Sequence, residues 1–116
     1  MTSGRNQMLW RTQRISAHVL GLLVLVHLAL MVIAVQGGLT AAEILSRTQG
    51  AIGWLLFYSS FVILVSVHAP IGLKNILQEQ FGWRHSTASR LSILYGLALV
   101  VLGLRACWAV FTGGQL

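Results

Sequence analysis

Charged residues are scarce in this sequence, and acidic residues are the scarcest. Charged side chains make up 9% of the 116 residues, and the acidic ones are Glu43 and Glu79. A soluble domain carries roughly a quarter of its residues as charged side chains, so this composition excludes a soluble globule. The two carboxylates also lie far apart in the sequence and predict no acid–base pair, so we expect no catalysis by this chain alone.

Cysteine and proline each occur once, as Cys107 and Pro70. A single cysteine excludes an intrachain disulfide and cannot build a metal site by itself. The sequence also lacks a glycine-rich phosphate loop and a cysteine–histidine cluster with the spacing of a zinc site. Its Lys and Arg residues give a net charge of +6, but apolar runs separate them, so we expect no nucleic-acid partner.

Long apolar runs are what the sequence has in abundance. Apolar residues make up 56% of the chain, and its mean hydropathy is +0.78. Three runs, at about 15–35, 51–73 and 91–111, reach the roughly 20 residues that a helix needs to cross the hydrocarbon core. All three must be helical because lipid offers exposed backbone groups no hydrogen-bond partner. We therefore predict an all-α membrane protein, with residues 1–116 forming a single membrane domain of three transmembrane helices.

Basic residues lie mainly on two of the segments that flank these runs. They are Arg5, Arg11 and Arg14 before the first run, and Lys74, Arg84 and Arg90 between the second and the third. The connection between the first two runs has Arg47, offset by Glu43. Because basic segments stay on the cytoplasmic side, we expect the amino terminus to face the cytoplasm (or the matrix) and the carboxyl terminus the opposite side. We expect the protein to lie in the inner (cytoplasmic) membrane. Thr40 and Glu43 also have the spacing of a capping box, which predicts a short interfacial helix.

Histidines are the chemically notable residues inside the predicted spans. His18, His27 and His68 all lie there, and an ionisable side chain within a membrane indicates function by default. Since acidic partners are nearly absent, these imidazoles are better suited to ligating a metal than to relaying protons, and haem iron between helices fits them. The alternative is a small non-redox membrane protein whose histidines serve packing or proton or solute transport.

His68 is the strongest of these candidates. Gly72 follows it by four residues on the same helix face, which leaves room beside the ring for a flat ligand. Pro70, between them, removes a backbone N–H and predicts a kink at this level. A plain hydrogen bond from His68 to a neighbouring helix remains open as an alternative.

The residues around His68 belong to a longer pattern, in which Gly72, Lys74 and Glu79 follow the histidine. This pattern resembles the second-span signature of the cytochrome b-type membrane anchor subunits of succinate dehydrogenase and fumarate reductase. In that signature a haem-ligating histidine is followed by a glycine, a basic residue and an acid. The residues 14–17, Arg-Ile-Ser-Ala, are similar to the segment that opens the first span in this family. The resemblance implies that His68 binds haem b and that Lys74 meets a haem propionate.

The resemblance also implies a quinone pocket at the cytoplasmic membrane surface. Arg14 and Ser16 would line it, with Glu79 at the position of a family Asp. Trp10 is close enough in sequence to line the same pocket, or else it anchors the helix at the membrane interface. Gln80 stands where the smaller anchor subunit has a quinone-bonding Tyr, so either there is no quinone site near Glu79 or its Tyr comes from another chain.

The other two histidines in the spans need separate treatment. His18 and His27 are nine residues apart and therefore lie on opposite sides of one helix. If Arg14 and Lys74 mark one membrane level, His27 lies about 10 Å deeper than His68, so one haem does not take both. We favour two haems, each completed by another chain as in the di-haem anchors of this family, with His18 the weaker candidate. The single-haem alternative uses His68 and leaves His27 as a packing residue.

The family resemblance implies partners as well as cofactors. These are a flavoprotein subunit and an iron–sulfur subunit at the cytoplasmic face, membrane lipid, and a second anchor chain or a second copy, since three spans enclose a haem poorly. Arg105, near the outer end of the third run, either snorkels to the surface or pairs with a haem propionate. The predicted function is to pass electrons between the iron–sulfur subunit and membrane quinone, and a haem-free quinone anchor is a further alternative.

Overall fold

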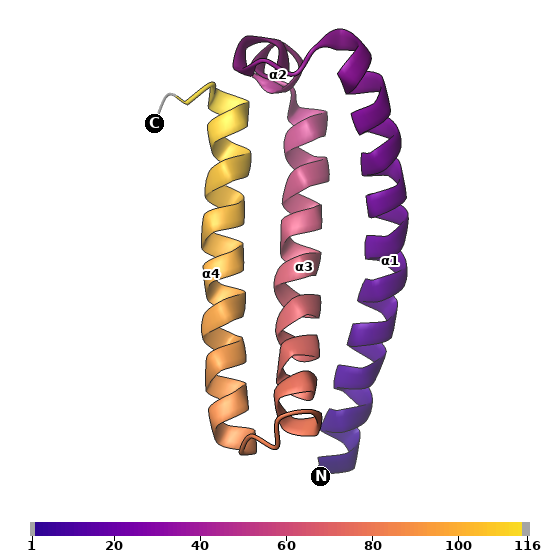
Figure 1. Cartoon of the computed structure of the whole chain (residues 1–116), viewed down its shortest axis with the longest axis vertical. Helices are drawn as coiled ribbons and strands as arrows, with labels where there is room; N and C mark the ends of the chain where they lie inside the picture. Colours follow the sequence, from indigo (N-terminus) through magenta and orange to yellow (C-terminus); the bar gives the residue numbers. More distant parts are fainter. Residues whose placement is uncertain (1, 115–116) are drawn as a thin grey trace.

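The computed structural model describes residues 2–114, which form four helices and short connections (Figure 1). The helices are α1 (Thr2–Gly37), α2 (Ala41–Thr48), α3 (Ile52–Glu79) and α4 (His85–Thr112). The three long helices α1, α3 and α4 run alongside one another, and the short helix α2 lies across one end. Each long helix is long and apolar enough to cross a membrane, and the described residues contain no strand. The predicted all-α architecture is therefore confirmed.

The long helices extend beyond the predicted apolar spans. Helix α1 begins before the basic residues that precede the first run, and α3 continues to Glu79. Only residues 80–84 separate α3 from α4, because the polar sequence after the second run has no Gly or Pro to end the helix before Gly82. Gly82 has φ +66°, a left-handed conformation that glycine adopts without strain, and it allows this tight connection. Polar helix ends therefore project past the apolar spans.

Helix α2 begins with the predicted capping box. The Thr40 side chain accepts a hydrogen bond from the Glu43 N–H at 3.2 Å, and the Glu43 carboxylate accepts one from the Thr40 N–H at 2.9 Å. This bond from the backbone of Thr40, together with a second from its hydroxyl, lowers the pKa of Glu43 from its ordinary value of 4.5. Just past its other end the chain is tied to α4, since the Gly50 N–H donates to the Phe111 carbonyl at 2.8 Å. The capping box thus sets where the chain turns back toward the membrane.

Helices α3 and α4 pack closely through small residues of α4. Ala88, Ser92, Gly96 and Cys107 are buried and lie along the face of α4 that meets α3. A Cβ on Gly103 would lie 2.5 Å from Val62 Cγ1, which shows how near the two helices come. In lipid, where apolar surface gains little from leaving the solvent, such close van der Waals packing is a main source of helix association.

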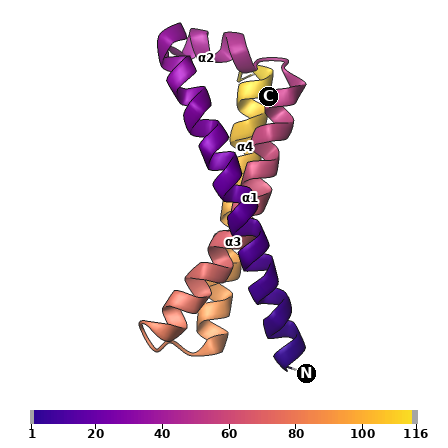
Figure 2. The ribbon, with the colours of Figure 1, turned by 90° about the vertical axis from the view of Figure 1, so that its right-hand side faces the viewer.

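Helix α1 packs less closely and crosses α3 at an angle. In Figure 2 the two ribbons cross near the middle of the molecule and separate toward both ends. Much of α1 faces outward, and Leu22, Leu25 and Val32 are each more than 60% exposed. The crossing brings polar residues of α1 and α3 together near its centre and leaves space between the helices toward each end.

Candidate functional site

A hydrogen bond between side chains joins α1 to α3 close to the point where they cross. The Nδ1 atom of His68 lies 3.1 Å from the Oγ of Ser16. The Ser16 hydroxyl donates to the backbone carbonyl of Gln13 at 3.0 Å. Serine suits this position because its short side chain can bond back to its own helix and still reach a neighbouring one. Ser16 is 4% exposed, so the helices shield this contact from their surroundings.

The contact with Ser16 leaves the second ring nitrogen of His68 free. Within residues 2–114, the only hydrogen bond to the His68 side chain is at Nδ1, so Nε2 has no partner there. The ring is partly exposed, which keeps it accessible from outside this chain. A neutral imidazole nitrogen with a free lone pair is a good ligand for a transition metal. The described part of the chain gathers no group of three or more metal-ligating side chains, so a lone histidine suits a macrocycle that brings its own nitrogens.

Gly72 has a different role from the predicted one. The space beside it is taken by Gln13 of α1, and a Cβ on Gly72 would lie 3.2 Å from Gln13 Nε2. The absence of a side chain at Gly72 therefore makes space for Gln13 of α1, one turn along α3 from the His68–Ser16 contact. The predicted opening for a flat ligand at this position is filled by protein, because α1 crosses α3 here. A ligand on Nε2 of His68 must approach from another direction.

A polar cavity of about 400 Å³ lies between α1, α3 and the start of α4, toward the end with the amino terminus. Hydrogen-bonding side chains from all three helices line it, together with a few apolar ones. The lining residues are Asn6, Leu9, Trp10, Gln13, Ile71, Lys74, Asn75, Gln78 and His85. Since the carboxylates of Glu43 and Glu79 are not among them, the cavity offers Lys74, amides and imidazole to a ligand. Such a lining suits a ligand that accepts hydrogen bonds.

Of the residues predicted for a quinone pocket, Trp10 lines this cavity, and Lys74, predicted to meet a haem propionate, lines it as well. The amide side chains and His85 were not predicted for it. His85 is exposed at the first residue of α4 and faces Gln78, with 3.4 Å between His85 Nδ1 and Gln78 Nε2. These residues come from separate helices and belong to no local motif. The sequence feature that could have indicated the cavity is the concentration of uncharged polar residues at the amino-terminal end of the first helix.

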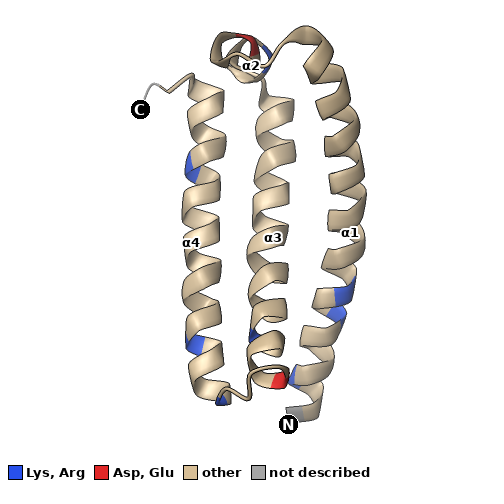
Figure 3. Ribbon diagram, viewed as in Figure 1, with Lys and Arg blue, Asp and Glu red and all other residues tan. Residues whose placement is uncertain are grey.

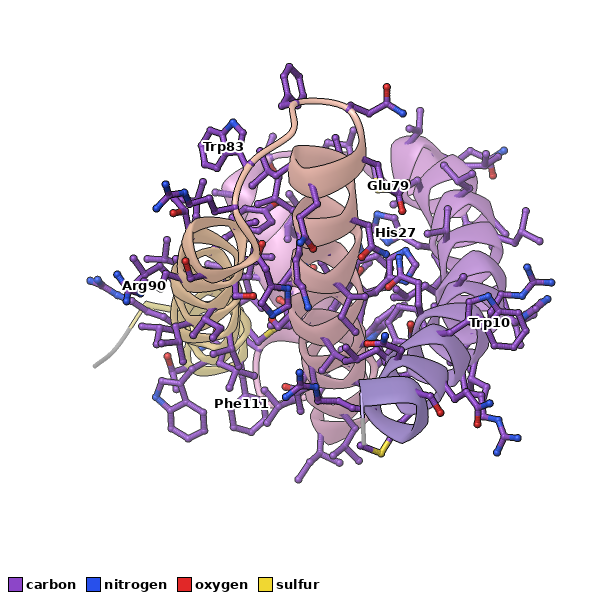
Figure 4. All side chains as sticks on the ribbon, turned by 90° about the horizontal axis from the view of Figure 1, so that it is seen from below. Trp10, His27, Glu79, Trp83, Arg90 and Phe111 are labelled. Atoms are coloured by element: carbon purple, nitrogen blue, oxygen red, sulfur yellow. The ribbon has the colours of Figure 1, made fainter. Side chains whose placement is uncertain are left out.

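The other residues predicted for a quinone pocket lie around the cavity without lining it. The Arg14 guanidinium lies 5.1 Å from the centre of the Trp10 ring, on the exposed side of α1. The Trp10 ring is 61% exposed and points away from α3, as seen along the helices in Figure 4. Glu79 is exposed at the last residue of α3, and Ser16 faces His68 instead. Trp10 therefore forms the rim of the cavity.

His18 lies on the outward side of α1. Its Nδ1–H donates to the carbonyl of Arg14 at 2.7 Å, and its side chain is exposed. The hydrogen bond back to its own helix holds the ring against α1, and among residues 2–114 no hydrogen bond joins His18 to α3.

His27 lies in an aromatic cluster farther along the α1–α3 interface, where Figure 4 shows it between the two helices. Its ring meets Tyr58 edge-on at 5.9 Å between centroids and Phe61 at 6.4 Å. Ser16, which marks the level of His68 on α1, precedes His27 by eleven residues, or about 16 Å along the helix axis. The two histidines are therefore too far apart along the bundle to ligate the same iron.

A second cavity, of about 340 Å³, lies at the opposite end of the α1–α3 crossing, beneath α2. It is mainly apolar, with Trp54 and Tyr58 on one side and Arg47 at the polar end. The Arg47 guanidinium donates to the carbonyl of Gly38 at 2.9 Å. Arg105 is not part of this site, because it follows Gly96 by nine residues and so lies on the opposite side of α4 from α3.

Three apolar helices, a histidine held between two of them and a polar cavity near one end of the bundle define a multi-pass helical membrane protein with a polar site between its helices. The family model of the succinate dehydrogenase/fumarate reductase transmembrane subunit matches residues 3–111, and the chain belongs to this family. The searches of curated proteins and of solved structures gave no match. The family resemblance seen in the sequence is thereby confirmed.

Proposed function

We propose that this chain is the cytochrome b-type subunit of a succinate dehydrogenase or fumarate reductase complex. It holds haem b through His68, contributes to a quinone site, and connects the iron–sulfur subunit electronically with membrane quinone. The observation that supports this most strongly is the state of His68, whose Nδ1 is engaged by Ser16 and whose Nε2 is free in the described chain. Metal-ligating histidines have this arrangement, with the second nitrogen bonded to a polar group of the protein.

The residues around His68 fit a haem. Lys74 follows His68 by six residues, about 9 Å along α3 toward the membrane surface, where a cation can neutralise a propionate. A bound haem would supply one-electron transfer, and Nε2 of His68 would hold its iron. The partial exposure of His68 allows a second anchor chain, or a second copy of this one, to cover the other side of the haem.

The polar cavity supports a quinone site. Quinone carbonyl oxygens accept hydrogen bonds, and Lys74, Gln78 and His85 carry donors into the cavity. Its volume of about 400 Å³ lies within the usual range of small-molecule pockets. Trp10 at the rim and Arg14 beside it lie where the headgroup region begins, and Glu79 ends α3 at the same side. Quinone thus enters from the membrane and finds its donors at the polar ends of the helices.

The charge distribution supports the proposed orientation and partners. Figure 3 shows most Lys and Arg residues toward the end of the bundle that holds the amino terminus. By the positive-inside rule this end faces the cytoplasm, so the chain spans the inner membrane and the flavoprotein and iron–sulfur subunits dock here. The large exposed apolar faces of α1 and α4 are covered by lipid and by the second anchor chain.

His27 and Arg105 belong to a second haem in the two-haem form of this proposal. His27 lies among aromatic rings about 16 Å along α1 from the level of His68, so its haem is a separate one. Because Arg105 lies on the outward face of α4, away from His27, it would meet a propionate of the second haem bound by a neighbouring copy of the chain. In the single-haem form, Tyr58 and Phe61 simply hold the His27 ring by packing.

An optical difference spectrum of the purified complex tests this function. The reduced-minus-oxidised spectrum of the wild-type complex is expected to show a b-type haem, and His68→Ala is expected to remove it or halve it. His27→Ala distinguishes the two forms, because it lowers the haem content only if a second haem is present. A wild-type preparation that has no haem but retains both soluble subunits contradicts the cytochrome role and leaves a quinone anchor. Absence of both haem and soluble subunits contradicts the whole proposal.

A further inference from the structure

We propose that Ser16 is the positioning residue of the haem ligand. Its hydroxyl oxygen accepts a hydrogen bond from Nδ1–H of His68, and this keeps the lone pair of the imidazole on Nε2, directed at the iron. The inference rests on the proposed haem-binding function. It gives Ser16 a role different from the quinone contact that the family resemblance implies.

The directions of the hydrogen bonds follow from counting hydrogens. A serine hydroxyl has one hydrogen to donate, and a backbone carbonyl can only accept. Ser16 donates this hydrogen to the Gln13 carbonyl at 3.0 Å. The oxygen, 3.1 Å from His68 Nδ1, can then act only as an acceptor, so the hydrogen between them belongs to the imidazole. Nε2 of the neutral ring is left unprotonated.

The same contact becomes essential once Nε2 binds a metal. The ligated neutral ring carries its remaining proton on Nδ1, and an N–H without an acceptor is costly inside a membrane. Among the described residues, Ser16 is the only hydrogen-bond acceptor at this nitrogen. An acceptor on Nδ1–H also fixes the orientation of the ring and makes it a more basic ligand.

The surrounding packing holds Ser16 in place. Ser16 is 4% exposed, and Leu20, one turn farther along α1, is 8% exposed. One turn in the other direction, Gln13 fits against Gly72 of α3. Contacts on both sides thus hold the hydroxyl against His68 and exclude water, which could otherwise replace it as the acceptor.

Three variants of the intact complex test this role. Ser16→Ala removes the acceptor, and Ser16→Thr keeps a hydroxyl at the same position. Ser92→Ala is the matched control, because Ser92 is another buried helical serine, 3% exposed, whose hydroxyl has no hydrogen-bond partner in the described part of the chain. For each complex, haem retention is measured together with the midpoint potential of the haem in an optical redox titration.

Ser16→Ala is expected to weaken haem retention roughly tenfold, as outer-shell substitutions at metal sites commonly do. Its midpoint potential is expected to rise, because a less basic imidazole stabilises ferric iron less. A tenfold loss of preference for the ferric form corresponds to about 59 mV for a one-electron couple. Ser16→Thr and Ser92→Ala are expected to match the wild type in both measurements.

The outcomes separate this inference from the function on which it rests. If the wild-type complex holds haem and Ser16→Ala has unchanged retention and potential, the inference is overturned while the haem function stands. Equal changes in Ser16→Ala and Ser92→Ala also overturn it, since they show a general effect of losing a buried hydroxyl. Complete loss of haem in Ser16→Ala alone supports it. A wild-type complex without haem removes the proposed cytochrome function itself.

Discussion

Gly96 of α4 lies so close to Pro70 of α3 that a Cβ on the glycine would be 2.8 Å from the proline Cγ and 3.1 Å from the Ser66 carbonyl oxygen. The proline ring thus occupies the space left by the missing side chain. This contact lies only two residues from His68 on α3, so the packing of α4 supports the helix that carries the candidate haem ligand.

We expect Gly96→Ala to destabilise the packing of α3 on α4 by about 1–3 kcal/mol, as overpacking of a close contact does. The neighbouring atoms are a proline ring and a backbone carbonyl, neither of which can move aside easily. The thermal dissociation midpoint of the detergent-solubilised complex measures the effect. Gly21→Ala is the control, because no atom lies within 4 Å of a Cβ at that position of α1. An equal fall in both variants would count against the close contact.

We expect Gln78→Leu to weaken quinone use through loss of a hydrogen-bonding amide from the polar cavity. A hydrogen bond of this kind contributes about 1 kcal/mol, so KM for quinone is expected to rise roughly fivefold. The assay is quinone reduction by the complex over a range of quinone concentrations. Gln7→Leu makes the same chemical change at an exposed position of α1 outside the cavity and is expected to leave KM unchanged. Identical KM values for Gln78→Leu and the wild type would show that quinone binds elsewhere.

The capping box of α2 predicts a dependence of local stability on pH. Hydrogen bonds from the Thr40 N–H, and then from its hydroxyl, lower the pKa of Glu43 below 4.5. A carboxyl group with a lowered pKa stabilises the folded state above its unfolded pKa, and this stabilisation is lost as the pH falls through the folded pKa. The opening of α2 measured by amide hydrogen exchange, corrected for intrinsic rates, is therefore expected to increase below about pH 4.5. Glu43→Gln is expected to remove this pH dependence, and its persistence in that variant would assign it to another group.

The orientation of the chain can be tested with single cysteines. Cys107 is 6% exposed and is expected to react slowly with a membrane-impermeant thiol reagent, so it gives a low background. Gln7→Cys, near the start of α1, is expected to react only from the cytoplasmic side. Ser46→Cys, on the exposed side of α2, is expected to react only from the opposite side. The reverse pattern of labelling would contradict the positive-inside assignment.

Local sequence patterns were enough to predict the membrane class, the three spans, the capping box of Thr40 and Glu43, and His68 as the strongest candidate ligand. These features depend on local properties, namely the length of an apolar run, a spacing of three residues and an ionisable side chain within a hydrophobic segment. Each of these features depends on residues that are close together in the sequence, so each can be predicted from a single segment.

Which residues meet depends on how the helices pack against one another. Ser16 and His68 are 52 positions apart, and their hydrogen bond depends on the angle and register at which α1 crosses α3. The same crossing places Gln13, instead of a ligand, against Gly72, and it brings Gln78 and His85 into one cavity. Each helix carries these polar residues without any pattern that specifies their partners. The register of α1 against α3 depends on all the packing contacts along their interface, so it cannot be predicted from any one segment of the sequence.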